Sequence, residues 1–113
     1  MLTIYHLKNC DTCKKAIKAL EAKDIELNLI DVRADGIDAK TIETYAKAVG
    51  FETLLNTRST TWRGLDDSDK QNVDLAKAVQ LMSEHTTLIK RPVIDNNDEI
   101  SVGWSKAVQE QYL

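Results

Sequence analysis

The first third of the chain places an amphipathic stretch between two short apolar runs, and this order limits the possible folds more than any other feature. Residues 2–5 and 25–32 have the apolar character of short strands, whereas residues 11–23 repeat apolar side chains at helical spacing. Two strands joined by so long a helical connection cannot pair as an antiparallel hairpin. We therefore expect a βαβ unit whose two strands are parallel.

The middle of the chain, roughly residues 38–86, is predicted to be a helical insertion. Asp38 and Asp74 are good N-terminal caps, and each precedes apolar residues that recur with a helical period. The segment between these two helices has no clean period of either kind, so we expect a short helical turn followed by a polar loop. The loop is expected to hold Arg58, Trp62 and Arg63.

The last part of the chain is predicted to form a hairpin and a short helix. Two apolar strands, roughly residues 92–95 and 99–103, flank an Asn-Asn-Asp turn of a kind that tolerates positive φ, and Ser105 then begins a helix. No internal repeat, low-complexity tract or linker indicates a second domain. The order βαβ, helical insertion, ββα predicts an α/β protein with a thioredoxin-like fold and a mixed sheet, in which residues 1–113 form a single domain.

Composition and charge exclude several classes of function. The 113 residues, of which 42% are hydrophobic and 29% are charged, have the size and composition of one ordinary globular domain. A formal net charge of −3 argues against a general nucleic-acid binder, which would present a basic face. No apolar run approaches the roughly 20 residues that a membrane-spanning helix requires. We therefore expect a cytoplasmic monomer that contacts neither nucleic acid directly nor a membrane.

The two cysteines of the chain form a CxxC motif at the junction of the first strand and the helix. Cys10 precedes the first helical turn, where backbone N–H groups and the positive end of the helix dipole stabilise a thiolate. Cys13 lies one turn further along, on the side of the helix that faces the core. In the reducing cytoplasm such a pair favours redox catalysis, with Cys10 as the nucleophile and Cys13 placed to resolve a mixed disulfide.

Two other interpretations of the cysteines remain open, since they are either ordinary small buried residues or part of a metal site. A structural zinc site needs four ligands, and beyond the pair only His6 lies nearby, so no metal is expected. His6 itself is either a satisfied strand-end histidine or a neighbour that tunes Cys10. Asn9 is the other candidate supporting residue beside the motif.

Three further candidates lie outside the regular helical pattern. Pro92 opens the third strand, a position that tolerates proline; alternatively, a cis Arg91-Pro92 bond brings backbone next to the thiol, where it can pair with an extended peptide. Arg58 and Arg91 are either plain surface charges or groups that approach Cys10. In the second case they would hold its thiolate and bind an oxyanion or a carboxylate through forked hydrogen bonds.

The stretches TIYHLKNCDTCKKA, LIKRPVI and VGW resemble the arsenate reductase-like family, which includes ArsC, Spx and YffB, over nearly the whole chain. The stretch LLNTRSTTWRGLD resembles the YffB subgroup in particular. The resemblance implies a thioredoxin-like fold with a cis proline at Pro92, and it implies that Cys10 is the nucleophile. It also implies that Arg58 and Arg91 are the anion-binding arginines of the family.

The sequence departs from the family pattern at two positions. Arsenate reductases of this family use a further arginine after the hairpin, and Trp104 stands at the matching position. YffB-like and arsenate reductase relatives often carry a single N-terminal active-site cysteine, so Cys13 is the second departure. Spx, a redox-responsive transcription regulator that binds RNA polymerase, does carry CxxC.

Together these features predict a thiol-dependent oxidoreductase with glutathione as its co-substrate and no bound cofactor. We expect it to act on a small thiol or an oxidised substrate and to exchange electrons with glutaredoxin or thioredoxin. Two alternatives are arsenate reduction and Spx-like redox regulation. The RNA polymerase α subunit is an expected partner only under the last of these.

Overall fold

The computed structural model describes residues 1–97 and 99–113, and these residues divide into two compact units. Unit 1 comprises Met1–Asp35 and Arg91–Leu113, and unit 2 comprises Gly36–Lys90. The second unit contains the predicted helical insertion. That the whole chain behaves as a single domain stays a prediction.

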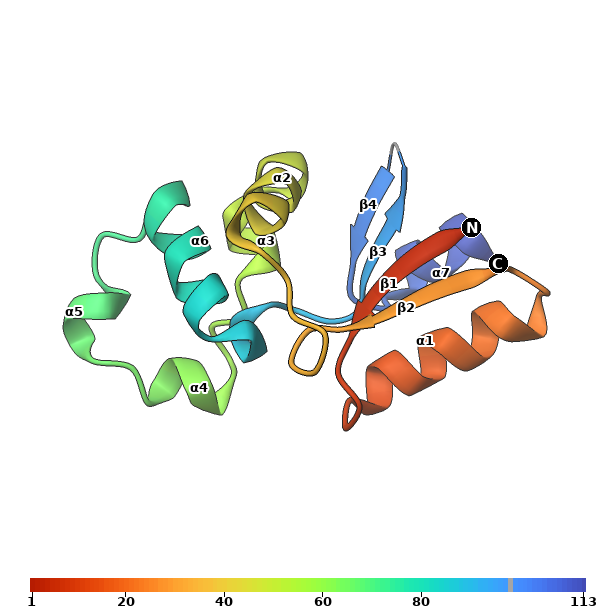
Figure 1. Ribbon diagram of the computed structural model, residues 1–113, viewed down its shortest axis with the longest axis horizontal. Helices are drawn as coiled ribbons and strands as arrows, with labels where there is room; N and C mark the ends of the chain where they lie inside the picture. The colour runs from red at the N-terminus through yellow and green to blue at the C-terminus, as the bar shows by residue number, and fades with distance from the viewer. Residues whose placement is uncertain (98) are drawn as a thin grey trace. The chain divides into compact units, whose positions relative to one another are not determined.

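Unit 1 is built on a four-stranded mixed sheet with the strand order β2-β1-β3-β4 (Figure 1). Strand β1, Leu2–His6, pairs in parallel with β2, Leu27–Asp31. Strand β3, Val93–Asn96, pairs antiparallel with the other edge of β1 and with β4, Glu99–Val102. This arrangement confirms the predicted βαβ unit, the C-terminal hairpin and the thioredoxin-like fold.

Two helices, α1 (Asp11–Ala22) and α7 (Lys106–Tyr112), pack against this sheet (Figure 1). The core between them and the strands is apolar because α1 turns one stripe of side chains inward. Its buried centre consists of Leu2, Ile4, Leu20 and Ile94, with Ile17, Trp104, Val108 and Tyr112 among the residues packed against it. Since α1 follows β1 directly, its N-terminus lies at the carboxyl ends of the parallel strands.

The segment that leads into β3 carries a cis peptide bond between Arg91 and Pro92, as the resemblance implied. The Pro92 carbonyl accepts a hydrogen bond from the Gly103 N–H at 2.8 Å. Gly103 has a φ of 83°, a conformation that glycine adopts without steric cost. In the predicted hairpin turn, Asn97 has a positive φ of 59°, and Asp98 lies outside the described residues.

Unit 2 is helical, and its two longer helices, α2 (Ala39–Val49) and α6 (Leu75–Glu84), pack against each other. The side chains of Asp38 and Asp74 cap them, each accepting the backbone N–H three residues further along, at 2.8 and 2.9 Å. Gly50 follows α2 with a φ of 89°. Both predicted caps and both predicted helices are therefore confirmed.

The segment between α2 and α6 differs from the predicted polar loop. It contains three helices of a single turn, which are α3 (Phe51–Leu54), α4 (Thr60–Arg63) and α5 (Asp67–Lys70). The prediction was wrong for Trp62 and Arg63, which lie on α4 because the Ser59 hydroxyl accepts the Trp62 N–H at 3.1 Å and caps the turn. Arg58 lies in the loop before α4. A single capped turn has no apolar repeat, so periodicity does not detect it.

The helices of the described residues are short, and α1 has 12 residues. None of them combines the length and the apolar character that crossing a membrane requires.

Candidate active site

Cys10 is the N-terminal cap of α1. A tight turn precedes it, in which the Cys10 N–H donates to the Leu7 carbonyl at 3.1 Å. The Cys10 backbone is extended, and its sulfur accepts the backbone N–H of Cys13 at 3.3 Å. The sulfur thus occupies the place that a serine or aspartate oxygen takes in an ordinary helix cap, next to the positive end of the helix dipole.

Cys13 has a very different environment, although it lies only one helical turn away. Its side chain is 1% exposed, whereas Cys10 is half-buried, and both are free thiols. Burial raises the pKa of the Cys13 thiol to about 12; the neighbouring Cys10 adds to the rise, and the positive charge of Arg91 opposes it. Cys13 is therefore protonated at neutral pH, and the two sulfurs are not chemically equivalent.

Arg91, which precedes Pro92 in the chain, lies close to this pair in unit 1. The Arg91 side chain is half-buried, and its charge is close enough to lower the pKa of Cys13 against the larger effect of burial. Pro92 is buried, and its carbonyl is engaged with Gly103, as described above. The sequence predicted both residues for this site; their roles in binding stay predictions.

His6 lies at the end of β1, directly opposite Asp31 at the end of β2. Its carbonyl accepts the Val32 N–H at 2.9 Å, as expected of a strand-end residue. The charge of His6 is among the influences that lower the pKa of Asp31. In the structure, His6 therefore acts on the pKa of Asp31. A direct effect of His6 on Cys10 stays a prediction.

Asp31 is a residue that sequence reasoning missed. It is 9% exposed, and its Oδ1 accepts the backbone N–H groups of Arg33 and Ala34, both at 2.8 Å. The Ala34 N–H and then the Arg33 N–H hold its pKa below the usual range against the effect of burial, and the Lys8 N–H acts in the same direction. A signal was present, since an aspartate at the end of an apolar run commonly closes a turn with the N–H groups that follow it.

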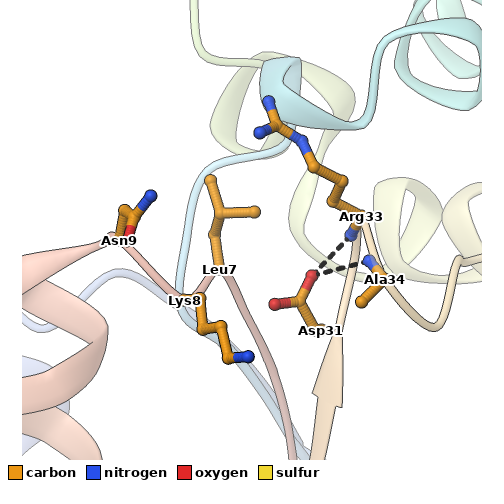
Figure 2. A pocket seen from close by; sticks show the side chains of 6 residues that line it. All are labelled: Leu7, Lys8, Asn9, Asp31, Arg33 and Ala34. Atoms are coloured by element: carbon orange, nitrogen blue, oxygen red, sulfur yellow. Dashed lines mark hydrogen bonds between the residues drawn. The ribbon is translucent and has the colours of Figure 1, made fainter.

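An open pocket of about 220 Å³ lies beside the turn that precedes Cys10 (Figure 2). Two loops supply its lining, one after β1 and one after β2. The lining residues are Leu7, Lys8, Asn9, Asp31, Arg33 and Ala34. Asn9, which the sequence named as a supporting residue, therefore contributes to a pocket adjacent to Cys10 in the chain.

Arg58 belongs to unit 2 and is exposed. Its N–H donates to Asn56 Oδ1 at 3.1 Å, and its carbonyl accepts from Arg63 Nη2 at 3.0 Å. Both contacts use backbone atoms of Arg58, so they fix the loop and do not involve the Arg58 guanidinium. The approach of Arg58 to Cys10 stays a prediction.

Two other sequence expectations concern metals and the third arginine. Within the residues that the structure describes, no group of three or more His, Cys, Asp or Glu side chains is arranged to hold a metal ion. Trp104, at the position matched to the further arginine of arsenate reductases, packs against the core cluster of unit 1. It contributes apolar contact there, where an arginine would contribute charge.

Comparison with known proteins covers nearly the whole chain. The family model described as "ArsC family" matches residues 5–112. An uncharacterized protein of Haemophilus influenzae is 42% identical over 106 residues, which cover 94% of this chain and 93% of that protein. A solved structure named as the YFFB protein is 34% identical, with a TM-score of 0.94, and the match covers 100% of this chain and 99% of that chain.

More distant relatives carry functional names. Global transcriptional regulator Spx 2 of Lactococcus lactis is 28% identical over 115 residues, covering 100% of this chain and 86% of that protein. Arsenate reductase of Haemophilus influenzae is 27% identical over 105 residues, covering 88% of each. The chain is thus similar, over most of its length, to proteins with two different functional names.

Proposed function

This chain belongs to the ArsC family, and from that premise we propose that it is a thiol-dependent oxidoreductase that uses Cys10 as its nucleophile and glutathione as its co-substrate. Its family makes it an arsenate reductase-like protein. The observation that carries the finer proposal is the contrast between a half-buried sulfur at the N-terminus of α1 and a fully buried sulfur one turn later.

The position of Cys10 supports a thiolate as the reacting species. Its sulfur accepts a backbone N–H, and the helix dipole favours negative charge at the same place. The thiolate is the form of cysteine that attacks disulfides and other electrophiles. Because Cys13 is protonated at neutral pH, Cys10 is the sulfur available for this first attack.

The reaction proceeds by two thiol-disulfide exchanges. The Cys10 thiolate attacks the glutathione sulfur of a mixed disulfide; a bond forms between the two sulfurs, and the substrate leaves as a thiolate that takes a proton from water. A second glutathione, as thiolate, then attacks the glutathione sulfur held on Cys10. This step forms glutathione disulfide and releases the Cys10 thiolate, so that one free glutathione is consumed for each mixed disulfide reduced.

A second branch uses Cys13 in place of the second glutathione. Cys13 loses its proton and attacks the Cys10 sulfur, which releases the bound thiol and leaves a Cys10–Cys13 disulfide for glutaredoxin or thioredoxin to reduce. Because burial raises the pKa of Cys13, this branch needs the loss of a proton from a buried thiol before the attack. Arg91, and Arg58 if it approaches, would hold an anionic group of the substrate. The reducing cytoplasm is the compartment in which we propose that this cycle runs.

The test is the rate at which the protein reduces a glutathionylated peptide with glutathione as reductant. We expect Cys10→Ser to lower the rate by at least about 100-fold, because the attacking sulfur is lost. We expect Cys13→Ser to stay within about 10-fold of the parent, because glutathione completes the cycle without it. Equal activity of the parent and the Cys10→Ser variant would overturn the proposal.

Two other functions have specific support. Arsenate reduction is favoured by the similarity to the Haemophilus influenzae enzyme of that name. Redox regulation is favoured by the similarity to Spx 2 together with the CxxC pair, whose oxidation would alter the start of α1. Capture of the RNA polymerase α subunit that depends on the redox state of the protein would favour the regulatory function over the enzymatic one.

A further inference from the structure

The pocket beside the Cys10 turn lies at the carboxyl ends of β1 and β2, where two loops diverge from adjacent parallel strands. Ligands of open α/β sheets commonly bind at this edge. Its volume of about 220 Å³ is below the range of roughly 300–1,000 Å³ that encloses a whole drug-sized ligand. A site of this size holds one end of a molecule the size of a tripeptide.

Both signs of charge are present in this pocket. The Asp31 carboxylate is fixed by the turn hydrogen bonds, and Figure 2 shows its second oxygen directed toward Lys8. Lys8 and Arg33 are exposed and lie on opposite sides of Asp31 in the same view. Leu7 and Ala34 add apolar contact. The pocket therefore offers one fixed anion, two exposed cations and an apolar wall.

We propose that this pocket binds the zwitterionic α-amino-acid end of the thiol co-substrate, which in glutathione is the γ-glutamyl end. The inference rests on the proposed function, and it identifies this pocket as the part of the protein that recognises glutathione among thiols. Asp31 accepts hydrogen bonds from the ammonium group, Arg33 on one side of it binds the carboxylate, Lys8 on the other side adds positive charge, and the methylene groups contact Leu7 and Ala34. A guanidinium suits a carboxylate because it donates two parallel hydrogen bonds.

A simple oxyanion fits this pocket less well than a zwitterion. Asp31 is ionised at neutral pH, because the N–H groups of Ala34 and Arg33 lower its pKa. A fixed carboxylate repels phosphate or arsenate at close range, whereas it attracts the ammonium of an amino acid. A purely cationic ligand would in turn meet Lys8 and Arg33.

The position of the pocket in the chain suits a ligand whose sulfur reacts at Cys10. Leu7, Lys8 and Asn9 precede Cys10 directly, and the hydrogen bond from the Cys10 N–H to the Leu7 carbonyl folds this loop into one turn. A turn of this kind keeps the Cα atoms of its first and fourth residues within about 7 Å of each other. The cysteine sulfur and the γ-glutamyl end of glutathione are separated by a comparable length of chain.

Binding of two unreactive thioethers to the reduced protein tests the proposal by calorimetry. S-methylglutathione carries the γ-glutamyl end, and S-methyl-cysteinylglycine lacks it. We expect the first to bind at least about 10-fold more tightly, and we expect Lys8→Gln and Arg33→Gln each to weaken it by about 3- to 10-fold. Lys23→Gln, which removes an exposed charge at the far end of α1, is the matched control and should stay within about 2-fold of the parent. These exposed positions avoid the folding risk of replacing Asp31.

Equal affinity for the two thioethers, or equal effects of Arg33→Gln and Lys23→Gln, would overturn the inference. Displacement of S-methylglutathione by inorganic phosphate at similar concentration would also overturn it, since it would reveal a site for simple anions. Measurements of turnover distinguish a wrong pocket assignment from a wrong proposed function. If Cys10-dependent turnover persists while Arg33→Gln leaves the KM for glutathione unchanged, only the pocket assignment is wrong. If the protein shows no turnover with glutathione or with 2-mercaptoethanol, the proposed oxidoreductase function is wrong. The calorimetric binding of the two thioethers then still tests whether the pocket binds the γ-glutamyl end.

Discussion

At the scale of single residues, Cys10 and Cys13 differ in how far solvent reaches their sulfur atoms, although only two residues separate them in the chain. The cap position leaves the Cys10 sulfur half-buried beside the helix N-terminus, and the apolar stripe of α1 carries Cys13 into the core. A protonated, enclosed thiol is a poor nucleophile until the surrounding structure or the pH changes.

Alkylation measures this difference directly. Because burial raises its pKa to about 12, only a very small fraction of Cys13 is a thiolate at pH 7 to 8. We expect iodoacetamide to modify the folded protein once, at Cys10, at pH 7 to 8, and to modify both sulfurs after denaturation. Mass spectrometry of peptides gives the positions. Rapid alkylation of the folded Cys10→Ser variant would show that Cys13 is not protected.

At the scale of elements, side-chain caps decide where the helices of unit 2 begin. Asp74 accepts the Lys77 N–H at 2.9 Å at the start of α6, whereas Asp66 precedes α5 without such a hydrogen bond. Asp74 and Asp66 carry the same side chain in front of a helix, but only Asp74 accepts a capping hydrogen bond. They therefore make a matched pair for mutation.

We expect Asp74→Ala to lower the free energy of unfolding by about 1 kcal/mol, because the first turn of α6 loses the acceptor for one N–H group. Asp66→Ala, which removes no cap hydrogen bond, should change it by less than about 0.5 kcal/mol. Urea unfolding monitored by circular dichroism gives both values. A loss of the same size in the two variants would mean that charge, and not capping, accounts for the effect.

Elements with a long apolar repeat were predictable from the sequence, and those without one were not. α1, α2 and α6 each bury a stripe, so their period and their caps were visible in the sequence. α4 depends on one serine hydroxyl, and α5 is a single turn, so neither leaves a repeat. In the candidate site, Cys10 and Cys13 were found because their spacing is itself a motif. The turn at Asp31 had a local signal, but the pocket did not, because it needs side chains from the loops after both β1 and β2 and no local pattern shows how those loops meet.

At the scale of the whole molecule, one departure from the family pattern bears on whether the chain reduces arsenate. The sequence resemblance matches Trp104 to the further arginine of arsenate reductases, and Trp104 packs against the apolar core of unit 1. Arsenate is a dianion near neutral pH, and loss of one cationic partner weakens the stabilisation of its transition state.

We therefore expect no arsenite above the level of the Cys10→Ser variant when arsenate is supplied with glutathione and glutaredoxin. The Haemophilus influenzae arsenate reductase, assayed in parallel, is the positive control. Arsenite formation at a rate comparable to that of the control enzyme would contradict the expectation and would place arsenate among the substrates.

The strand order β2-β1-β3-β4 also has a consequence for synthesis on the ribosome. β1 and β2 emerge early, yet the second edge of β1 has no partner until β3, residues 93–96, has been translated. The nascent chain must therefore carry an open strand edge while all of Gly36–Lys90 is being made. Chaperone contact during elongation would protect that edge until β3 leaves the exit tunnel.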